Sequence, residues 1–176
     1  MTDLPVDFRQ ATVLDAGKLL TLIQSAYRGD ASRAGWTTEA DLLEGQRTDA
    51  EELASILGDR EAHLLVATLK NEIVGCVLSR REHAVATIGL FAVRPDLQAL
   101  GLGKRLLAEV EKRAQRIFGV YRARMTVIAQ RVELIAWYVR RGYVVTGRTE
   151  PFPYGNARFG LPTRGDLQFV VLEKVL

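Results

Sequence analysis

Two glycines, Gly101 and Gly103, lie between an apolar stretch and a helix-like sequence, and this arrangement can bind phosphate. A glycine turn that opens a helix leaves backbone N–H groups unpaired next to the positive end of the helix dipole. A Cβ at either glycine would hinder both the tight turn and the close approach of an anion. The sequence therefore predicts a phosphate-binding loop over residues 98–104.

Two common phosphate motifs do not fit the spacing. A P-loop has a glycine ahead of its Gly-Lys pair and a Ser or Thr after it, where this chain has Gln98 and Arg105. A dinucleotide fingerprint needs a third glycine, where this chain has Leu106. The remaining pattern is Gln98-x-x-Gly101-x-Gly103, which follows an apolar strand that ends in Val-Arg-Pro.

This pattern resembles the acyl-CoA pyrophosphate loop of the GNAT superfamily of N-acyltransferases. A second motif, Glu133 to Tyr143, is similar to the helix of that family that carries a tyrosine and ends in Gly-Phe or Gly-Tyr. Two motifs in this order and spacing rarely coincide by chance. The resemblance extends over nearly the whole chain and implies a single N-acetyltransferase domain at residues 1–176.

The resemblance implies particular contacts with acetyl-CoA as co-substrate. The strand end of Phe91, Ala92 and Val93 would face the pantetheine and the thioester, with the Val93 N–H as the partner of the carbonyl. Arg131 stands where many members have an asparagine that contacts the cofactor arm, and it could instead reach a phosphate. The residues expected at the pyrophosphate are Gln98, Ala99, Leu100, Gly101, Leu102, Gly103 and Lys104.

Acetyl transfer requires that an amine lose a proton, that charge on the thioester oxygen be stabilised, and that the departing thiolate be protonated. In the family the amine attacks directly, so the resemblance implies neither an acyl-enzyme nor a metal. It implies that Tyr138 is the general acid, whereas a helical tyrosine can also be a core residue. The strand Thr87 to Phe91 lacks the carboxylate that many relatives use as base, and Glu133, His83, Glu150 or a water chain could replace it.

The missing carboxylate leaves a second interpretation open, in which the chain is a catalytically inactive, acyl-CoA-binding regulatory module. A structural protein with an incidental Gly-x-Gly turn is a third, and it predicts no binding of coenzyme A. The retained Tyr138 favours the enzyme. For the enzyme we expect a small-molecule or peptide amine as acceptor.

The elements that must position these residues follow from hydrophobic periodicity. The resemblance implies an α/β fold in which a mixed, mostly antiparallel, twisted sheet of about six or seven strands is flanked by about four helices. A first helix should follow the capping box Thr12-x-x-Asp15. We expect a second helical region at 38–57, broken near Gly45, and further helices at 103–118 and 132–141. Strands are expected at 8–11, 63–69, 73–79, 84–93, 125–129, 143–147 and 167–172.

Three segments have unusual composition. Gly89, inside the third long strand, indicates either a β-bulge or a glycine beneath a bulky neighbour. Residues 149–166 are rich in proline and glycine and are expected to form one long loop. Acidic residues outnumber basic ones in residues 37–61, which makes this segment and the loop candidate walls for a cationic amine, although solvated helix faces would show the same pattern.

Composition limits the other classes of function. The length of 176 residues and the 48% hydrophobic content fit one globular domain, as a monomer or a homodimer. No aromatic residues interleave the basic ones, which argues against nucleic acid, and no apolar run approaches the roughly 20 residues of a membrane helix. The first residues, Met1 to Pro5, lack the pattern of a signal peptide, and Cys76 in its apolar run predicts a buried, unreactive thiol, so we expect a cytoplasmic protein.

Overall fold

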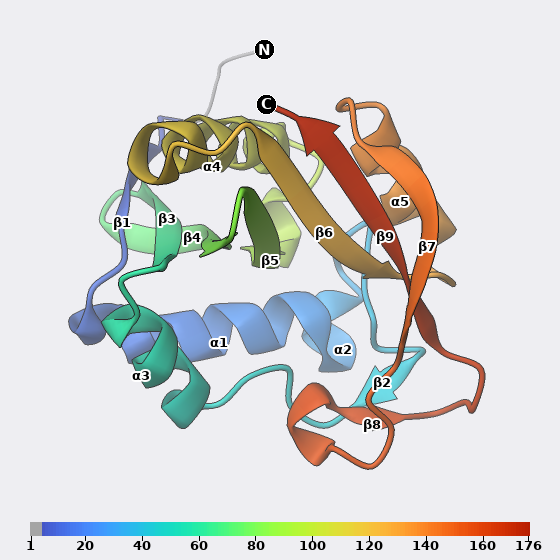
Figure 1. Cartoon of the computed structure of the whole chain (residues 1–176). Helices are drawn as coiled ribbons and strands as arrows, with labels where there is room; N and C mark the ends of the chain where they lie inside the picture. The colour runs from blue at the N-terminus through green and yellow to red at the C-terminus, as the bar shows by residue number, and fades with distance from the viewer. Residues whose placement is uncertain (1–4) are drawn as a thin grey trace.

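The computed structural model describes residues 5–176, so the expectation for the first residues falls almost entirely outside it. A seven-stranded sheet with the order β1-β3-β4-β5-β6-β9-β7 forms its centre (Figure 1). Only β5 and β6 are parallel, and all other neighbours are antiparallel, which confirms the mixed, mostly antiparallel sheet. The strands are β1 (Asp7–Gln10), β3 (Ala62–Leu69), β4 (Glu72–Glu82), β5 (Val85–Val93), β6 (Arg122–Ile128), β7 (Val144–Pro151) and β9 (Gln168–Val175).

Helices cover both faces of the sheet, because β3 to β5 are apolar on both sides. In β3, Leu65 packs toward α4 (Leu102–Phe118) and α5 (Val132–Val139), whereas Leu64 packs toward α1 (Ala16–Tyr27) and α3 (Ala50–Gly58). These are the four longer helices among the described residues, as expected, and a short α2 (Gly29–Ser32) follows α1. Each face therefore has its own apolar core, and α4 connects β5 to its parallel neighbour β6.

Strand β5 contains a β-bulge. Its register with β4 moves from Cys76↔Ala92 to Leu78↔Gly89, so β5 has one residue more than β4 in this interval, and Leu90 adopts a φ of 43°. The expectation of a bulge near Gly89 is thus confirmed. The bulky-neighbour alternative is wrong, because a Cβ on Gly89 would meet no atom within 4 Å.

The bulge changes the face to which β5 side chains point. Ile88 packs toward α4, whereas Leu90 packs toward α1, although residues two apart share one face in a regular strand. One inserted residue produces this reversal. As a consequence, Phe91 and Val93 face α4 and α5, the helices that carry the two sequence motifs.

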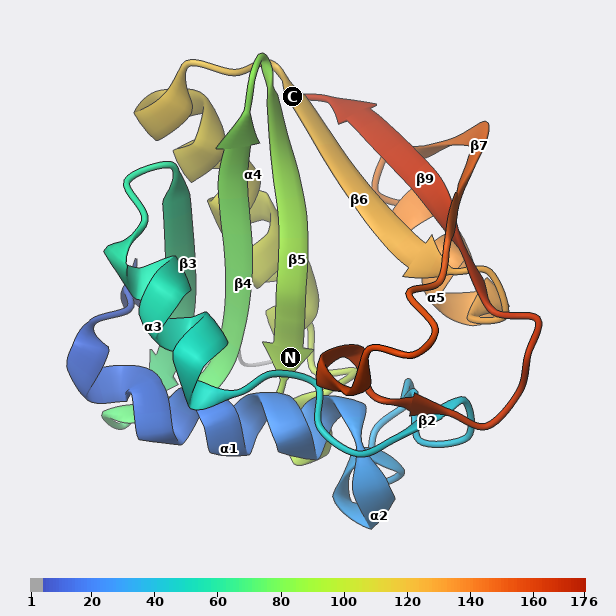
Figure 2. The same cartoon turned by 60° about the horizontal axis from the view of Figure 1, so that its bottom comes forward.

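Beyond the bulge, β5 and β6 separate. They pair only at Ala86↔Ala123 and Thr87↔Arg124, whereas β6 remains paired with β9 along its whole length. Figure 2 shows β5 and β6 moving apart toward the end where β5 leads into α4. The C-terminal half of β5 therefore has no strand partner on this edge, and the space beside it is covered by loops.

The covering loops are joined by a second, two-stranded sheet. Its strands are β2 (Leu43–Glu44) and β8 (Leu161–Pro162), which pair antiparallel. The Thr163 N–H also donates to the Leu42 carbonyl at 3.0 Å. The expected single loop at 149–166 is therefore wrong in part, since it contains the end of β7, a 3-10 turn at Ala157–Phe159, and β8.

The expected helix at 38–57 is wrong for its first half, because residues 38–49 form turns and β2. The Thr38 hydroxyl accepts the Ala40 N–H at 3.0 Å, a local bond that competes with helix formation. Leu43, in β2, is buried in a cluster with Ile128, Phe152 and Leu167, which are distant in sequence. Tertiary contacts thus override the local periodicity.

Helix α3 begins after an N-cap at Asp49. The Asp49 carboxylate accepts the Glu52 N–H at 2.8 Å. Among residues 5–176, no helix is long and apolar enough to cross a membrane.

Cys76 is buried as expected, and burial raises the pKa of its thiol to about 12, which keeps it unreactive.

The expected cap at Asp15 forms and also anchors β1. The Thr12 N–H donates to the Asp15 carboxylate at 2.8 Å, and the Arg9 guanidinium binds both of its oxygens, at 2.8 and 2.9 Å. The hydrogen bond from Arg9 is the largest cause that lowers the pKa of Asp15, to about 2, against the opposing effect of burial. The carboxylate must therefore be ionised to support the start of α1.

We predict that Asp15→Asn destabilises the protein at pH 7 by about 1–2 kcal/mol, the usual cost of losing a cap and a charged hydrogen bond. Because the pKa is lowered on folding, this stability is present above pH 4 and is lost as the pH falls toward 2. Urea unfolding from pH 7 to pH 3 should show the difference from wild type shrinking. Asp30→Asn, at an exposed carboxylate, is the control, and an equal difference at all pH values would contradict the prediction.

Candidate active site

The loop between β5 and α4 has the backbone geometry of an anion site. Ala99 and Gly101 have φ values of 65° and 83°, and Gly101 is the N-cap of α4 without a side-chain hydrogen bond at the cap. A Cβ on Gly101 would meet no protein atom within 4 Å, so the turn faces open space. The first N–H groups of α4 are therefore free of side-chain caps and can bind phosphate.

Gln98 fixes this loop to the end of β5. Its side-chain Nε2 donates to the Val93 carbonyl at 3.1 Å. Gly35 lies against the same amide, since a Cβ there would come within 2.1 Å of the Gln98 Oε1. The Gln98 side chain thus sets the position of the glycine turn relative to the strand end. This role differs from direct binding of a phosphate by the side chain.

Aromatic side chains pack behind the turn. A Cβ on Gly103 would lie 3.6 Å from Trp137 and 3.9 Å from Phe91, and the ring centroids of Trp137 and Phe91 are 6.0 Å apart. Arg141 stacks on Trp137, with its guanidinium 3.5 Å from the ring centroid, and donates to the Trp137 carbonyl at 2.7 Å. The start of α4 is thereby held against α5.

Two cavities meet beside the C-terminal half of β5. The first is bounded by the glycine turn, the start of α4 and the aromatic residues of α5, and the second lies between the separated strands β5 and β6 under the covering loops. Five residues belong to both walls: Tyr27, Phe91, Arg131, Leu134 and Tyr138. A group bound in one cavity can therefore meet a group bound in the other at these residues.

Tyr138 stands at this junction and is only 6% exposed. Its hydroxyl has no hydrogen-bond partner among residues 5–176, and burial raises its pKa, so that the phenol stays protonated at neutral pH. The Tyr27 hydroxyl, by contrast, donates to the Phe91 carbonyl at 3.0 Å, so this carbonyl already has a hydrogen-bond partner. Of the two tyrosines, Tyr138 is thus the one with a proton available to a ligand.

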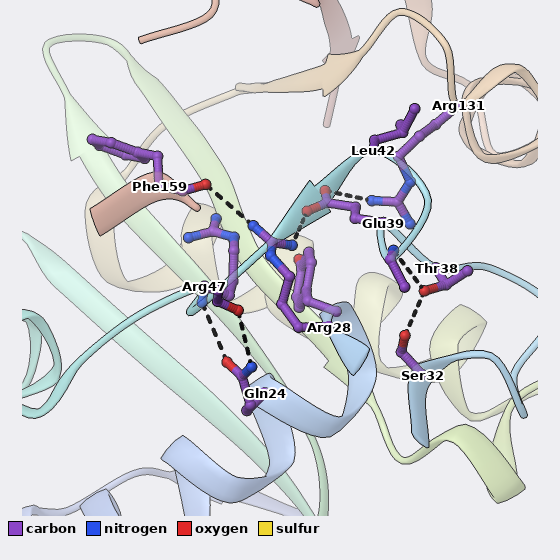
Figure 3. Close-up of polar contacts among 12 residues, drawn as sticks. Gln24, Arg28, Ser32, Thr38, Glu39, Leu42, Arg47, Arg131 and Phe159 are labelled. Atoms are coloured by element: carbon purple, nitrogen blue, oxygen red, sulfur yellow. Dashed lines mark hydrogen bonds and ion pairs between the residues drawn. The ribbon is translucent and has the colours of Figure 1, made fainter. Parts of the chain in front are cut away.

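A buried ion-pair network supports the second cavity (Figure 3). Glu39 pairs with Arg28 through one oxygen and with Arg131, at 2.8 Å, through the other. Arg131 also donates to the Thr37 hydroxyl at 2.8 Å, and Arg28 donates to the Phe159 carbonyl at 3.2 Å. Burial raises the pKa of Glu39, but the charges of its arginine neighbours, Arg131 foremost, lower it overall, so Glu39 remains ionised.

The candidate bases fall in different places. Glu150, on β7, lines the second cavity together with Tyr138. Glu133 lies on the outer side of α5, in a shallow depression that neither Tyr138 nor Phe91 lines, and His83 lies in the turn between β4 and β5, away from the separated strands. Among these three, only Glu150 can meet an acceptor in the second cavity. The described residues contain no group of His, Cys, Asp and Glu that could hold a metal ion.

The acidic residues of the segment 37–61 are largely occupied by arginines. Asp41 pairs with Arg33, and Arg158 pairs with both Asp49 and Glu51. Glu39 and Leu43 of this segment line the second cavity, but most of its negative charges are paired with arginines within the fold. The reason to expect a cationic amine therefore no longer holds.

The comparisons with known proteins agree with this geometry. The model of the acetyltransferase (GNAT) family matches residues 22–143. The chain belongs to the GNAT acetyltransferase family. A comparison with curated proteins gives no match.

Solved structures of the same fold cover almost the whole chain. The ribosomal-protein-S18-alanine N-acetyltransferase from Escherichia coli has a TM-score of 0.73 at 18% identity, with 97% of this chain and 93% of that one covered. The PaiA N-acetyltransferase from Thermoplasma acidophilum, in complex with coenzyme A, has a TM-score of 0.64 at 16% identity, with 100% of both chains covered. A GNAT family acetyltransferase from Elizabethkingia anophelis with acetyl-CoA bound has a TM-score of 0.63 at 19% identity, with 99% and 100% covered.

In this GNAT domain most of the predicted site residues come together. Ala92 and Leu102, each 1% exposed, have side chains in the apolar cores, so only their backbone could reach a ligand, and Leu100 lies outside the first cavity. Arg131 lines it, but its guanidinium is held by Glu39 and Thr37, so a contact with phosphate stays a prediction. The predicted residues that line the first cavity are Phe91, Val93, Gln98, Ala99, Gly101, Gly103, Lys104, Arg131 and Tyr138.

Sequence reasoning missed the contribution of the first helix and the segment after it. Tyr27, Arg28 and Glu39 lie outside both GNAT motifs and have no spacing that relates them to Arg131 or Tyr138. Trp36 packs on Trp137 with ring centroids 6.3 Å apart. The Gly35-Trp36 pair was the one available signal, since a glycine beside an aromatic residue is typical of close packing.

We predict that Glu39→Gln lowers the free energy of unfolding by about 3–5 kcal/mol, because two buried guanidinium groups lose their shared counter-charge. Chemical denaturation at neutral pH measures the loss. Asp41→Asn is the matched control: it removes an exposed ion pair from the same segment, where solvent screens the interaction, and should have a much smaller effect. Equal effects of the two substitutions would show that the network does not hold the loops.

Proposed function

We propose that this GNAT acetyltransferase moves an acetyl group from acetyl-CoA to a primary amine by direct attack of the amine on the thioester. The observation that carries the proposal is the junction of the two cavities at Tyr138 and Phe91. One cavity begins at an uncapped helix N-terminus suited to a pyrophosphate, and the other lies on the far side of the junction, where an acceptor can enter. Similar structures contain coenzyme A or acetyl-CoA, which supports acetyl-CoA as the co-substrate.

In the proposed complex the pyrophosphate binds the backbone of residues 98–104, with Lys104 at the edge of the first cavity adding positive charge. The pantetheine follows the open edge of β5, where Phe91 to Val93 lack a strand partner. The thioester then reaches the junction. The aromatic residues of α5 exclude water from this path, which strengthens the polar interactions inside it.

The reaction needs one acid and one base. The amine nitrogen attacks the carbonyl carbon, the C–S bond breaks, and the departing thiolate takes the proton of the Tyr138 hydroxyl. Burial raises the pKa of Tyr138, so its hydroxyl stays protonated at neutral pH and can donate a hydrogen bond to the sulfur as negative charge develops there. Glu150 accepts the proton of the amine, directly or through water, since it is the candidate base that lines the acceptor cavity.

Acetyl-CoA should raise the melting temperature of the wild-type protein by mass action. We predict that Gly101→Val abolishes this rise, because the side chain enters the open space where the pyrophosphate would lie. Gly119→Val is the matched control, since Gly119 has a similar φ of 65° at the opposite end of α4 and the same backbone strain. Both variants should melt earlier than wild type, but only the control should keep the rise. A rise retained by Gly101→Val would contradict phosphate binding at this turn.

We predict that Tyr138→Phe lowers kcat by about 10²-fold or more, the usual contribution of one general acid, with little change in acetyl-CoA affinity. The change removes one hydroxyl that has no protein partner, so the melting temperature should stay near that of wild type. Tyr121→Phe is the control and should turn over like wild type, because Tyr121 is exposed and lines neither cavity. Steady-state release of coenzyme A with a panel of amines measures the effect. Normal turnover by Tyr138→Phe would make Tyr138 a core residue, and absence of turnover in the wild type would favour the inactive, acyl-CoA-binding module.

A further inference from the structure

The second cavity combines an apolar wall with several charged groups. It has a volume of about 380 Å³, in the range of small-molecule sites. Its apolar lining comes from β5, β6 and the covering loops, and includes Ile88, Met125, Ile128, Phe152 and Phe169. The charged side chains in its wall are Arg28, Glu39, Arg47, Arg131 and Glu150.

Arg47 is the cation of this wall that makes no ion pair among residues 5–176, although its charge is one of those that lower the pKa of Glu39. Arg28 and Arg131 share Glu39, whereas no ion pair or hydrogen bond involves the Arg47 guanidinium, which lies over the Tyr27 ring at 5.1 Å from the centroid. Glu150 likewise has no ion pair within the described range. The cavity therefore offers one unused positive group and one unused negative group.

The backbone around Arg47 is held by the side chain of Gln24. The side chain of Gln24, on α1, accepts the Arg47 N–H at 3.3 Å and donates to the Gly45 carbonyl at 3.1 Å (Figure 3). The loop that carries Arg47 is thus tied to a rigid helix. The guanidinium itself lies over the Tyr27 ring, at 5.1 Å from the centroid, and can bind an anion from there.

The electrostatic surroundings favour an anion beside Arg47. Figure 3 shows Arg47 beside Arg28, and burial together with the charge of Arg47 lowers the pKa of Arg28. Two guanidinium groups repel each other in a half-buried site, and a bound carboxylate would relieve this repulsion. Planar, bidentate binding of a carboxylate is also the geometry for which a guanidinium is best suited.

We propose that the acceptor of this GNAT acetyltransferase is a small amine that bears a carboxylate and an apolar side chain, with the carboxylate bound by Arg47. This inference rests on the proposed function, since it assigns the substrate class of the same site. The apolar side chain packs on the wall formed by Phe152, Phe169 and Ile128, and the amine lies toward Glu150 and the junction. An apolar α-amino acid has these three groups in one molecule.

The test compares three acceptors that share one apolar body: phenylalanine, phenylalaninamide and phenethylamine. Coenzyme A release gives kcat/KM for each with the full-length wild-type protein. We expect phenylalanine to exceed the other two by about 10- to 100-fold, the range for a hydrogen-bonded charge. In Arg47→Gln the ratio of phenylalanine to phenylalaninamide should fall by a similar factor, and Arg47→Lys should restore part of it. The ratio within one variant cancels differences in acetyl-CoA binding.

Arg60→Gln is the matched control, because Arg60 is an exposed arginine in the same acidic segment and outside the cavity. A second measurement is the binding of N-acetylphenylalanine and its amide to the protein saturated with coenzyme A. Retention of the phenylalanine preference by Arg47→Gln, or equal binding of acid and amide by the wild type, would overturn the assignment. Turnover of the neutral amines alone would do the same while leaving acetyl transfer intact, whereas failure of acetyl-CoA to bind at all would refute the proposed function itself.

Discussion

The separation of β5 from β6 is the constraint on which the rest of the structure depends. A parallel pair that continued beyond Thr87 would close the sheet and fill the space where both cavities meet. The bulge at Leu90 prevents this, because it turns Phe91 and Val93 toward α4 and α5 and sends the strand end away from β6. One extra residue in a strand thus creates an open backbone edge next to a helix N-terminus, which are the two backbone features that an acyl-CoA site requires.

The unpaired edge of β5 is covered by loops, and a buried ion-pair network holds these loops together. Glu39 joins Arg28 at the end of α1 to Arg131 at the start of α5, and Arg28 reaches the C-terminal loop through the Phe159 carbonyl. Each of these groups would be costly to bury alone, so the network forms only when all four segments are in place. Among residues 5–176, Arg47 makes no ion pair, so it adds a positive charge to the wall of the second cavity.

Much of the fold could be predicted from the sequence, because the signals were local. The stripe of Leu106, Val110 and Ala114 defined α4 to within one residue, and the apolar runs of β3 to β5 predicted strands at these positions. The glycine turn was also a local signal, since Gly101 adopts the positive φ that its position after an apolar strand indicated. The helix expected from residue 38 does not form, for the converse reason. The helical periodicity is present in the sequence, but Leu43 and Glu39 are stabilised more by contacts with residues distant in sequence.

For the candidate site, the sequence by itself determined the backbone elements of the motifs: the strand end, the glycine turn and the helix that carries Tyr138. These depend on interactions within a few residues, which spacing records. Only the tertiary structure decided that Tyr138 lies between two cavities, that Arg131 is held by Glu39, and that Arg47 of the acidic segment lines the second cavity. The physical reason is that the electrostatic potential at a site depends on the charges that are near it in space. The acidic residues pair with arginines from other segments, so the charge at the cavity has the opposite sign from the one that composition indicated.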